Sequence, residues 1–262
     1  MKSTQPFIKF AITGGASPST SIRVELYKNG DVITQIKNAW PVITTNDEVG
    51  IYKYAITEAE IQSLITEAHK QKNLNSYYGE KLPGSLKYHL TISDDTNDKI
   101  IRWDHFASLP KALENFSESL QQLLKNSLQY NDQTIKISLE ISSKNTQNNA
   151  TIYIHNTGKM PVTIILPEHT ILKKRTLLIA HKEENDSAYL NLPAIYSDGI
   201  PFQFETTESS FTIATDEKVS FSNTLLLEKN KTWYAMMEVQ LKINTTTNTV
   251  AHCFLLAKGI QN

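Results

Sequence analysis

Two pairs of adjacent residues have side chains that could do acid–base or nucleophilic chemistry. Asp104 precedes His105, and a carboxylate beside an imidazole can orient the ring as a general base. His252 precedes Cys253, which would suit a thiol–imidazole pair. Adjacent residues of a strand point to opposite faces of a sheet, so neither pair is assembled by its spacing. We therefore expect Asp104 to end a strand and Cys253 to be a small buried hydrophobic residue.

Motifs that bind phosphate, nucleotides or catalytic metals are absent from the sequence. It has no His-Glu-x-x-His, no Gly-x-x-x-x-Gly-Lys-Ser/Thr, no Gly-x-Gly-x-x-Gly and no Gly-x-Ser-x-Gly. The glycine-rich stretch at residues 14–19 lacks the lysine of a phosphate loop and predicts a tight turn between strands. The seven histidines are scattered, without the paired spacing of zinc ligands. We expect no catalytic residues, no metal site and no cofactor.

Composition excludes several classes of partner. Lys and Arg number 26 against 27 Asp and Glu, so no basic field is present to attract nucleic acid. No apolar run approaches the roughly 20 residues that cross a bilayer, so we expect no membrane association. The first residues are not followed by the apolar core of a secretory signal. We expect a cytoplasmic protein, with a trimmed secreted chain as the alternative.

Residues 1–133 mix strands with two helices. Thr57 and Glu60 match a capping box, and apolar residues at helical spacing follow it. A second helix is expected from Pro110, which the first helical position tolerates. Asn29 and Gly30 predict a two-residue hairpin turn. The pattern predicts an α+β domain, an antiparallel sheet with two helices on one face, with strands at residues 7–12, 22–27, 31–36, 50–56, 86–93 and 99–104.

After a short linker at residues 131–133 the helical period disappears. About seven short apolar runs separated by turn residues predict an all-β immunoglobulin-like sandwich over residues 134–262. The expected strands of this second domain are residues 135–141, 151–155, 162–166, 171–180, 219–227, 234–243 and 250–256.

Long loops offer better candidates for function than any catalytic motif. Tyr and Trp anchor many protein interfaces, and long loops in compact domains are commonly functional. The alternative is that these aromatic side chains cap sheet edges and fill the seam between domains. The candidate binding residues in the loops are Gly14, Gly15, Ser17, Pro18, Ser19, Trp40, Tyr77 and Tyr78.

Residues 6–128 contain a series of short motifs in a fixed order. They are Gly14-Gly15, the helix residues Ile61, Leu64, Ile65 and Ala68, the strand residues Tyr88, Leu90 and Ile92, then Trp103-Asp104 and Leu109-Pro110. This order resembles that of emfourin-like proteins, small bacterial inhibitors of thermolysin-type metallopeptidases. Through Asn156-Thr157-Gly158 and Pro161-Val162-Thr163-Ile164, the second half is more weakly similar to immunoglobulin-like intracellular proteinase-inhibitor domains.

These resemblances imply a non-enzymatic protein that binds another protein, specifically an inhibitor whose loop occludes the cleft of a thermolysin-type metallopeptidase. Such a loop would be at residues 14–21 or at Tyr77 and Tyr78. One alternative is a structural or adaptor protein that binds another protein, or assembles with itself, through its immunoglobulin-like half. Another is an enzyme with a dispersed active site that uses Asp104 and His105.

Overall fold

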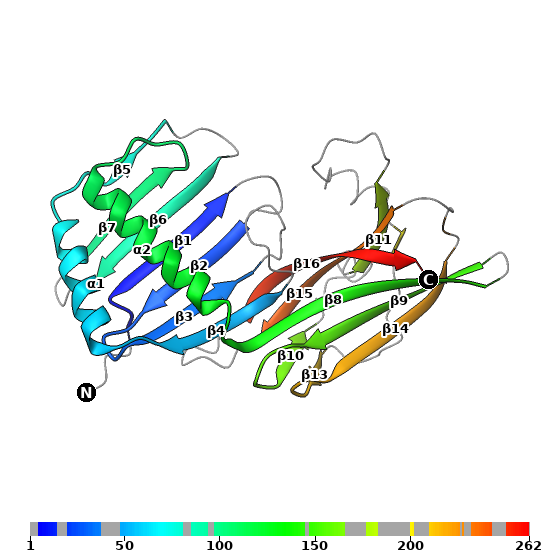
Figure 1. Cartoon of the computed structure of the whole chain (residues 1–262). Coiled ribbons are helices and arrows are strands. Elements are labelled where there is room, and N and C mark those ends of the chain that lie inside the picture. Colours follow the sequence, from blue (N-terminus) through cyan, green and yellow to red (C-terminus); the bar gives the residue numbers. More distant parts are fainter. Residues whose placement is uncertain are drawn as a thin grey trace. The chain divides into compact units, whose positions relative to one another are not determined.

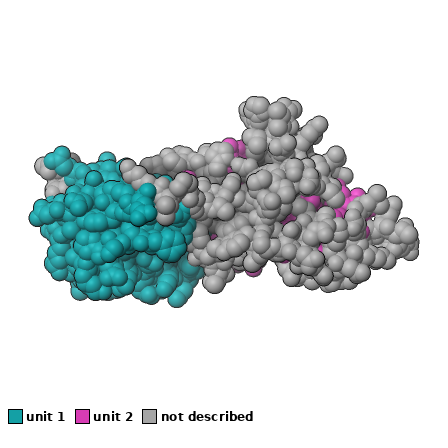
Figure 2. Space-filling view, turned by 90° about the horizontal axis from the view of Figure 1, so that it is seen from above, with its two compact units in different colours: residues 1–36, 51–132 teal, residues 37–50, 133–262 magenta. Residues whose placement is uncertain are grey.

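Strands dominate the part of the chain that the structure describes. Within this part the chain forms sixteen strands and two helices (Figure 1). It divides into a first unit, residues 1–36 and 51–132, and a second unit, residues 37–50 and 133–262 (Figure 2). The computed structural model describes residues 5–14, 20–37, 48–80, 85–93, 97–144, 147–165, 177–182, 200–201, 210–225, 227, 232–242 and 250–261.

The described residues of the first unit form a sheet of seven strands, and the fourth strand begins with two residues of the second unit. They are β1 (Ile8–Gly14), β2 (Thr20–Leu26), β3 (Asp31–Ile36), β4 (Val49–Ala55), β5 (Tyr77–Tyr78), β6 (Leu86–Ser93) and β7 (Asp98–Asp104). Their order is β4-β3-β2-β1-β6-β7-β5. The β1–β2, β2–β3, β1–β6 and β6–β7 pairs are antiparallel, whereas β5 runs parallel to β7.

Two helices, α1 (Glu58–Lys70) and α2 (Lys111–Ser127), lie on one face of this sheet (Figure 1). The apolar face of the second helix is buried, with Leu113, Phe116 and Leu120 at most 1% exposed. This helix contacts β2 and β3, and it also contacts α1. The helices therefore supply the apolar layer that the sheet needs on that face.

The capping box predicted at the start of the first helix is confirmed. The Thr57 hydroxyl accepts a hydrogen bond from the Glu60 backbone N–H at 3.3 Å, and the Glu60 carboxylate accepts one from the Thr57 backbone N–H at 2.7 Å. These bonds lower the pKa of Glu60, because they favour its charged form. The second helix begins at Lys111, one residue after the predicted Pro110, which is its N-cap.

Replacing Thr57 with alanine is expected to lower the free energy of unfolding by about 1 kcal/mol, because an N-terminal N–H of the helix loses its acceptor. Urea unfolding followed by circular dichroism would measure the change. Ser63→Ala is the matched control, since Ser63 is exposed on the same helix and does not cap it. Equal midpoints for the two variants would contradict the capping role.

The second unit is built from the remaining strands. In it β9 lies between β8 and β14, and both pairs are antiparallel. The long β15 pairs with β16, β11 and β10, and β16 pairs in parallel with β8. The strands are β8 (Asn131–Lys144), β9 (Gln147–Asn156), β10 (Val162–Ile165), β11 (Leu177–Lys182), β12 (Ile200–Pro201), β13 (Ser210–Ile213), β14 (Lys218–Leu225), β15 (Thr232–Lys242) and β16 (Val250–Gln261).

Asn156 fixes a turn inside the second unit. Its side-chain amide is fully buried and donates hydrogen bonds to the backbone carbonyls of Met160, Ile213 and Ala214 at 2.9–3.1 Å. Its side-chain oxygen accepts a bond from the Gly158 N–H at 2.9 Å. The Asn156-Thr157-Gly158 sequence thus has a structural role, because it satisfies backbone groups that would otherwise be buried without partners.

The predicted fold class, an α+β domain followed by a separate immunoglobulin-like sandwich, is wrong. In the second unit the described strands β12-β11-β15-β16-β8 follow one hydrogen-bonded order, and β9, β10, β13 and β14 branch from it. A sandwich would keep its two sheets apart, but β16 bonds to β15 along most of its length and to β8 at residues 259–261. The described part of the chain is therefore mostly β, with two helices, and the strands of the second unit do not separate into two sheets.

Candidate functional site

Two of the loops that the sequence marked as candidates begin at the same end of the first unit's sheet. At the end of β1, Gly14 pairs with Thr20 of β2 and with Leu86 of β6. The next residue of β6, Lys87, pairs with Asp104, the last residue of β7. The short β5 pairs with residues 102–103, so it also lies at this end. We call this region, residues 14, 77–79, 86 and 104–106, the Gly14 end.

Glycine is required at position 14 by the close approach of another backbone segment. The φ angle of Gly14 is +93°, which side chains rarely adopt, and a Cβ here would lie 2.5 Å from the Ser85 carbonyl oxygen. Gly14 therefore sets the direction in which the chain leaves β1. Of the other predicted binding residues, Gly15, Ser17, Pro18, Ser19 and Trp40 lie outside the described residues.

Tyr77 is tied to the buried end of β7. Its hydroxyl donates a hydrogen bond of 2.7 Å to a carboxylate oxygen of Asp104, a residue only 3% exposed. Gly79 packs against the same carboxylate, since a Cβ there would lie 2.8 Å from Oδ2, and its φ angle is +113°. The Tyr78 hydroxyl instead accepts a bond from the Asn75 N–H at 3.1 Å. These contacts anchor residues 75–79 to the end of the sheet.

Replacing Tyr77 with phenylalanine is expected to lower the free energy of unfolding by about 1–3 kcal/mol, because a buried carboxylate loses a hydrogen-bond donor. Tyr78→Phe is the matched control and is expected to cost less than about 1 kcal/mol, because its hydrogen bond is exposed. Guanidinium unfolding monitored by fluorescence would compare the free energies of unfolding of the two variants. A larger loss for Tyr78→Phe would contradict this anchoring of the segment.

A row of aromatic rings runs from the core of the sheet to its surface at the Gly14 end. Trp103 stacks on Tyr88 with centroids 5.4 Å apart and planes 3° apart. Tyr88 stacks in turn on His105 at 5.9 Å, and its hydroxyl is 2.9 Å from the His105 Nδ1. His105 meets Phe106 edge to face at 4.8 Å. Phe106 ends the row and is 83% exposed, whereas Trp103 is 3% exposed.

Asp104 and His105 have separate hydrogen-bond partners in this arrangement. The carboxylate of Asp104 accepts from Tyr77, whereas the His105 ring is bonded to Tyr88. Burial raises the pKa of Tyr88, because it disfavours the phenolate. These hydrogen bonds hold the end of β7 in place and do not join Asp104 to His105 as a paired acid and base.

Cys253 lies in the second unit and is 2% exposed. Burial raises the pKa of its thiol to about 12, so the reactive thiolate is disfavoured. This agrees with the expected small buried hydrophobic residue. Among the described residues, no group of three or more His, Cys, Asp or Glu side chains is placed to hold a metal ion. No helix in the described part of the chain is long and apolar enough to span a membrane.

Similarity to known proteins was found among solved structures. No family model matches the chain, and no curated protein matches it. Among solved structures, the ASH / PapD-like domain of human CEP192 (PapD-like domain 7) is similar with a TM-score of 0.24 and 11% sequence identity. The match covers 49% of this chain and 84% of that chain. A similarity at this level defines neither the fold nor the function.

Phe106 is the residue of the Gly14 end that the sequence analysis missed. The signal was an aromatic residue between the end of a predicted strand at Asp104 and the helix expected from Pro110, with no apolar period around it. A large apolar side chain in so short a connection either turns inward to the core or faces solvent. In the structure the Phe106 side chain faces solvent.

Proposed function

We propose that the chain is a protein-binding module and that the Gly14 end is its binding surface. The observation that carries the proposal is the 83% exposure of Phe106 at the end of an ordered row of rings. Exposed aromatic side chains are frequent hot spots, because they bury a large apolar area when a partner covers them. A single exposed apolar residue is ordinary on a protein surface, but this one is held beside two candidate loops.

Preorganisation favours this surface over the other exposed apolar side chains. The ring of Phe106 rests on His105, which is bonded to Tyr88. Side chains that are already held in place lose little conformational entropy when they bind. Tyr77 and Gly79 likewise hold residues 77–79 against Asp104. A partner would therefore meet a surface that needs little reordering.

The partner that we propose is a thermolysin-type metallopeptidase, which the chain would inhibit by covering its active-site cleft. Two features support this choice: the resemblance of residues 6–128 to emfourin-like inhibitors, and the convergence of two candidate loops at the Gly14 end. Inhibition would be steric, because a rigid sheet end placed over the cleft excludes the substrate. It would require no reacting group on the inhibitor.

Steady-state assays with purified chain and several thermolysin-type metallopeptidases test this function. We expect saturable inhibition at micromolar concentration or below, and no inhibition of a serine peptidase assayed in parallel. Absence of inhibition of every metallopeptidase would reject the inhibitor function. A mass that rises with concentration, with peptidases unaffected, would instead favour the adaptor or self-assembling alternative.

A further inference from the structure

Three cationic side chains lie together on the face of the first unit's sheet that points away from the helices. Leu90 of β6 and Ile101 of β7 are fully buried on the helix side. Side chains alternate between the faces of a strand, so His89 and Arg102, which pair with each other, lie on the other face. Lys87 precedes His89 by two residues and shares that face. We call Lys87, His89 and Arg102 the cationic cluster.

The members of the cationic cluster repel one another. The Cβ atoms of directly opposed strand residues, such as His89 and Arg102, are about 4.5–5.5 Å apart, and like charges so placed destabilise a sheet. The pKa of His89 is lowered, first by burial and then by the charges of Arg102 and Lys87. The His89 ring therefore senses repulsion from a neighbour on its own strand and from one on the next strand.

The carboxylates near the cationic cluster do not balance its charge. Asp104 lies on the same face and pairs with Lys87, but it is 3% exposed and accepts a hydrogen bond from Tyr77. Its single charge offsets at most one of the two permanent cations, Lys87 and Arg102. Among the described residues no ion pair joins the cluster to a carboxylate. Residues 15–19 and 81–84, which adjoin this end of the sheet in sequence, contain no Asp or Glu.

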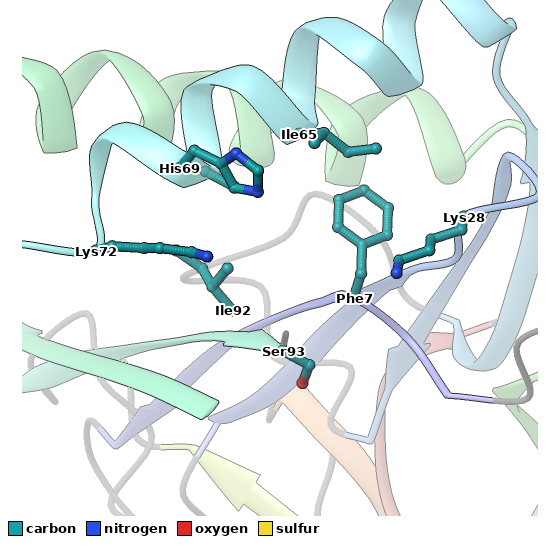
Figure 3. A pocket seen from close by; sticks show the side chains of 8 residues that line it. Phe7, Lys28, Ile65, His69, Lys72, Ile92 and Ser93 are labelled. Atoms are coloured by element: carbon teal, nitrogen blue, oxygen red, sulfur yellow. The ribbon is translucent and has the colours of Figure 1, made fainter. Parts of the chain in front are cut away.

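Other cationic side chains of the first unit already have partners. Arg23 lies on the same face, in β2, and forms an ion pair of 2.5 Å with Glu25. Lys28 and Lys72 line a pocket of about 420 Å³ beside α1, and both already interact with other groups of the chain (Figure 3). The charge of the cationic cluster is therefore available to a partner, whereas these three charges are not.

We propose that the cationic cluster binds an acidic segment of a protein partner, one that carries several carboxylates close together. The cluster is continuous with the Gly14 end, because Lys87 follows Leu86 and Arg102 pairs with Tyr77. The inference thus rests on the proposed protein-binding function and names the chemistry of the partner's surface. A guanidinium such as that of Arg102 can hold a carboxylate through two hydrogen bonds. Bound carboxylates would also replace repulsion within the cluster with attraction.

Titration of the full chain with a labelled oligoglutamate peptide, followed by fluorescence anisotropy, tests the proposal. We expect saturable binding that weakens at least about fivefold between roughly 0.05 M and 0.3 M salt, because salt screens exposed charges. An oligolysine peptide should not bind. Single-stranded DNA is the competing class of anion, and tighter binding of the DNA than of the oligoglutamate would overturn the proposal.

Matched variants locate the binding. Lys87→Gln with Arg102→Gln should weaken the oligoglutamate at least about fivefold, because two exposed ion pairs are worth about 1 kcal/mol together. Arg23→Gln should leave the affinity within about twofold, since Arg23 is already paired with Glu25 on the same face. Circular dichroism checks that each variant folds. Equal losses in the two variants, or no saturable binding of the peptide, would overturn the proposal.

The pKa of His89 gives a second readout at the cluster itself. Bound carboxylates favour the charged imidazolium, so the oligoglutamate should raise this pKa in an NMR titration. An unchanged pKa at saturating peptide would place the peptide elsewhere and contradict the proposal. None of these measurements uses a peptidase. Peptide binding without inhibition of any metallopeptidase would therefore support acidic recognition and reject only the peptidase as the partner.

Discussion

Gly50→Ala is expected to lower the free energy of unfolding by about 2–6 kcal/mol, the largest loss we predict for a single methyl group. Gly50 has a φ angle of +133°, where a side chain is strained by about 1–3 kcal/mol. A Cβ at this position would also overlap the carbonyl oxygen of Gln133 and lie 2.9 Å from the Cα of Thr134. Both obstacles are backbone atoms of β8, so relief requires a strand to move, and forced overpacking adds about 1–3 kcal/mol.

Gly259→Ala is the matched control for this substitution, because it adds the same methyl group to another strand. A Cβ there would meet side-chain methyl groups of Leu139 and Ile141 at 3.1 Å, as well as the Trp233 carbonyl oxygen at 3.1 Å, without a positive φ. We expect a smaller loss, since those methyl groups can shift. Urea unfolding of both variants shows which substitution lowers the free energy of unfolding more. A Gly50→Ala midpoint equal to or above that of Gly259→Ala would contradict the prediction.

Phe106→Ala is expected to weaken inhibition of a thermolysin-type metallopeptidase by about 30- to 1,000-fold, the range of an interface hot spot of about 2–4 kcal/mol. The stability of the chain should change little, because the ring is 83% exposed. Inhibition constants and thermal midpoints of wild type and variant, measured side by side, separate the two effects.

Met160→Ala is the control for Phe106→Ala. The Met160 side chain is 46% exposed in the second unit, so its truncation also removes exposed apolar surface but leaves the Gly14 end intact. Its inhibition constant should remain within twofold of wild type. If Met160→Ala weakened inhibition as much as Phe106→Ala, the Gly14 end would not be the binding surface.

Local elements of the fold could be predicted from the sequence. The start of α1 followed from Thr57 and Glu60, because a capping box is complete within four residues. The hairpin between β2 and β3 was also predicted, but its turn is longer than the expected two residues. Gly30 donates to the Tyr27 carbonyl and has a φ angle of +89°, as in a three-residue turn with a bulge.

Strand pairing could not be predicted, because it depends on contacts between distant segments. The expected linker at residues 131–133 is the start of β8, although its residues are polar. Gln133 is 4% exposed and Thr134 is fully buried, and the close approach of Gly50 explains how they fit. Polar residues at a strand start look like a linker until the neighbouring strand is known. This is why the predicted separate sandwich was wrong.

The candidate site was predictable only in part. Gly14 and Tyr77 were chosen for their residue types, and the strand register brings them to one end of a sheet. The bond from Tyr77 to Asp104 spans 27 residues, and no local pattern indicates it. The Phe106 ring contacts His105, which is bonded to Tyr88 of β6, a pairing that spans 17 residues. Residue type thus suggested the site, and long-range pairing determined its geometry.

Hydrogen–deuterium exchange of the full chain with and without a thermolysin-type metallopeptidase tests the binding surface most directly. A catalytically inactive variant of the peptidase would prevent cleavage during the measurement. We predict slower amide exchange in peptides that cover residues 77–93 and 98–110, and unchanged exchange in peptides that cover residues 147–165. Protection confined to the second unit, or no protection at saturating peptidase, would contradict the assignment of the Gly14 end.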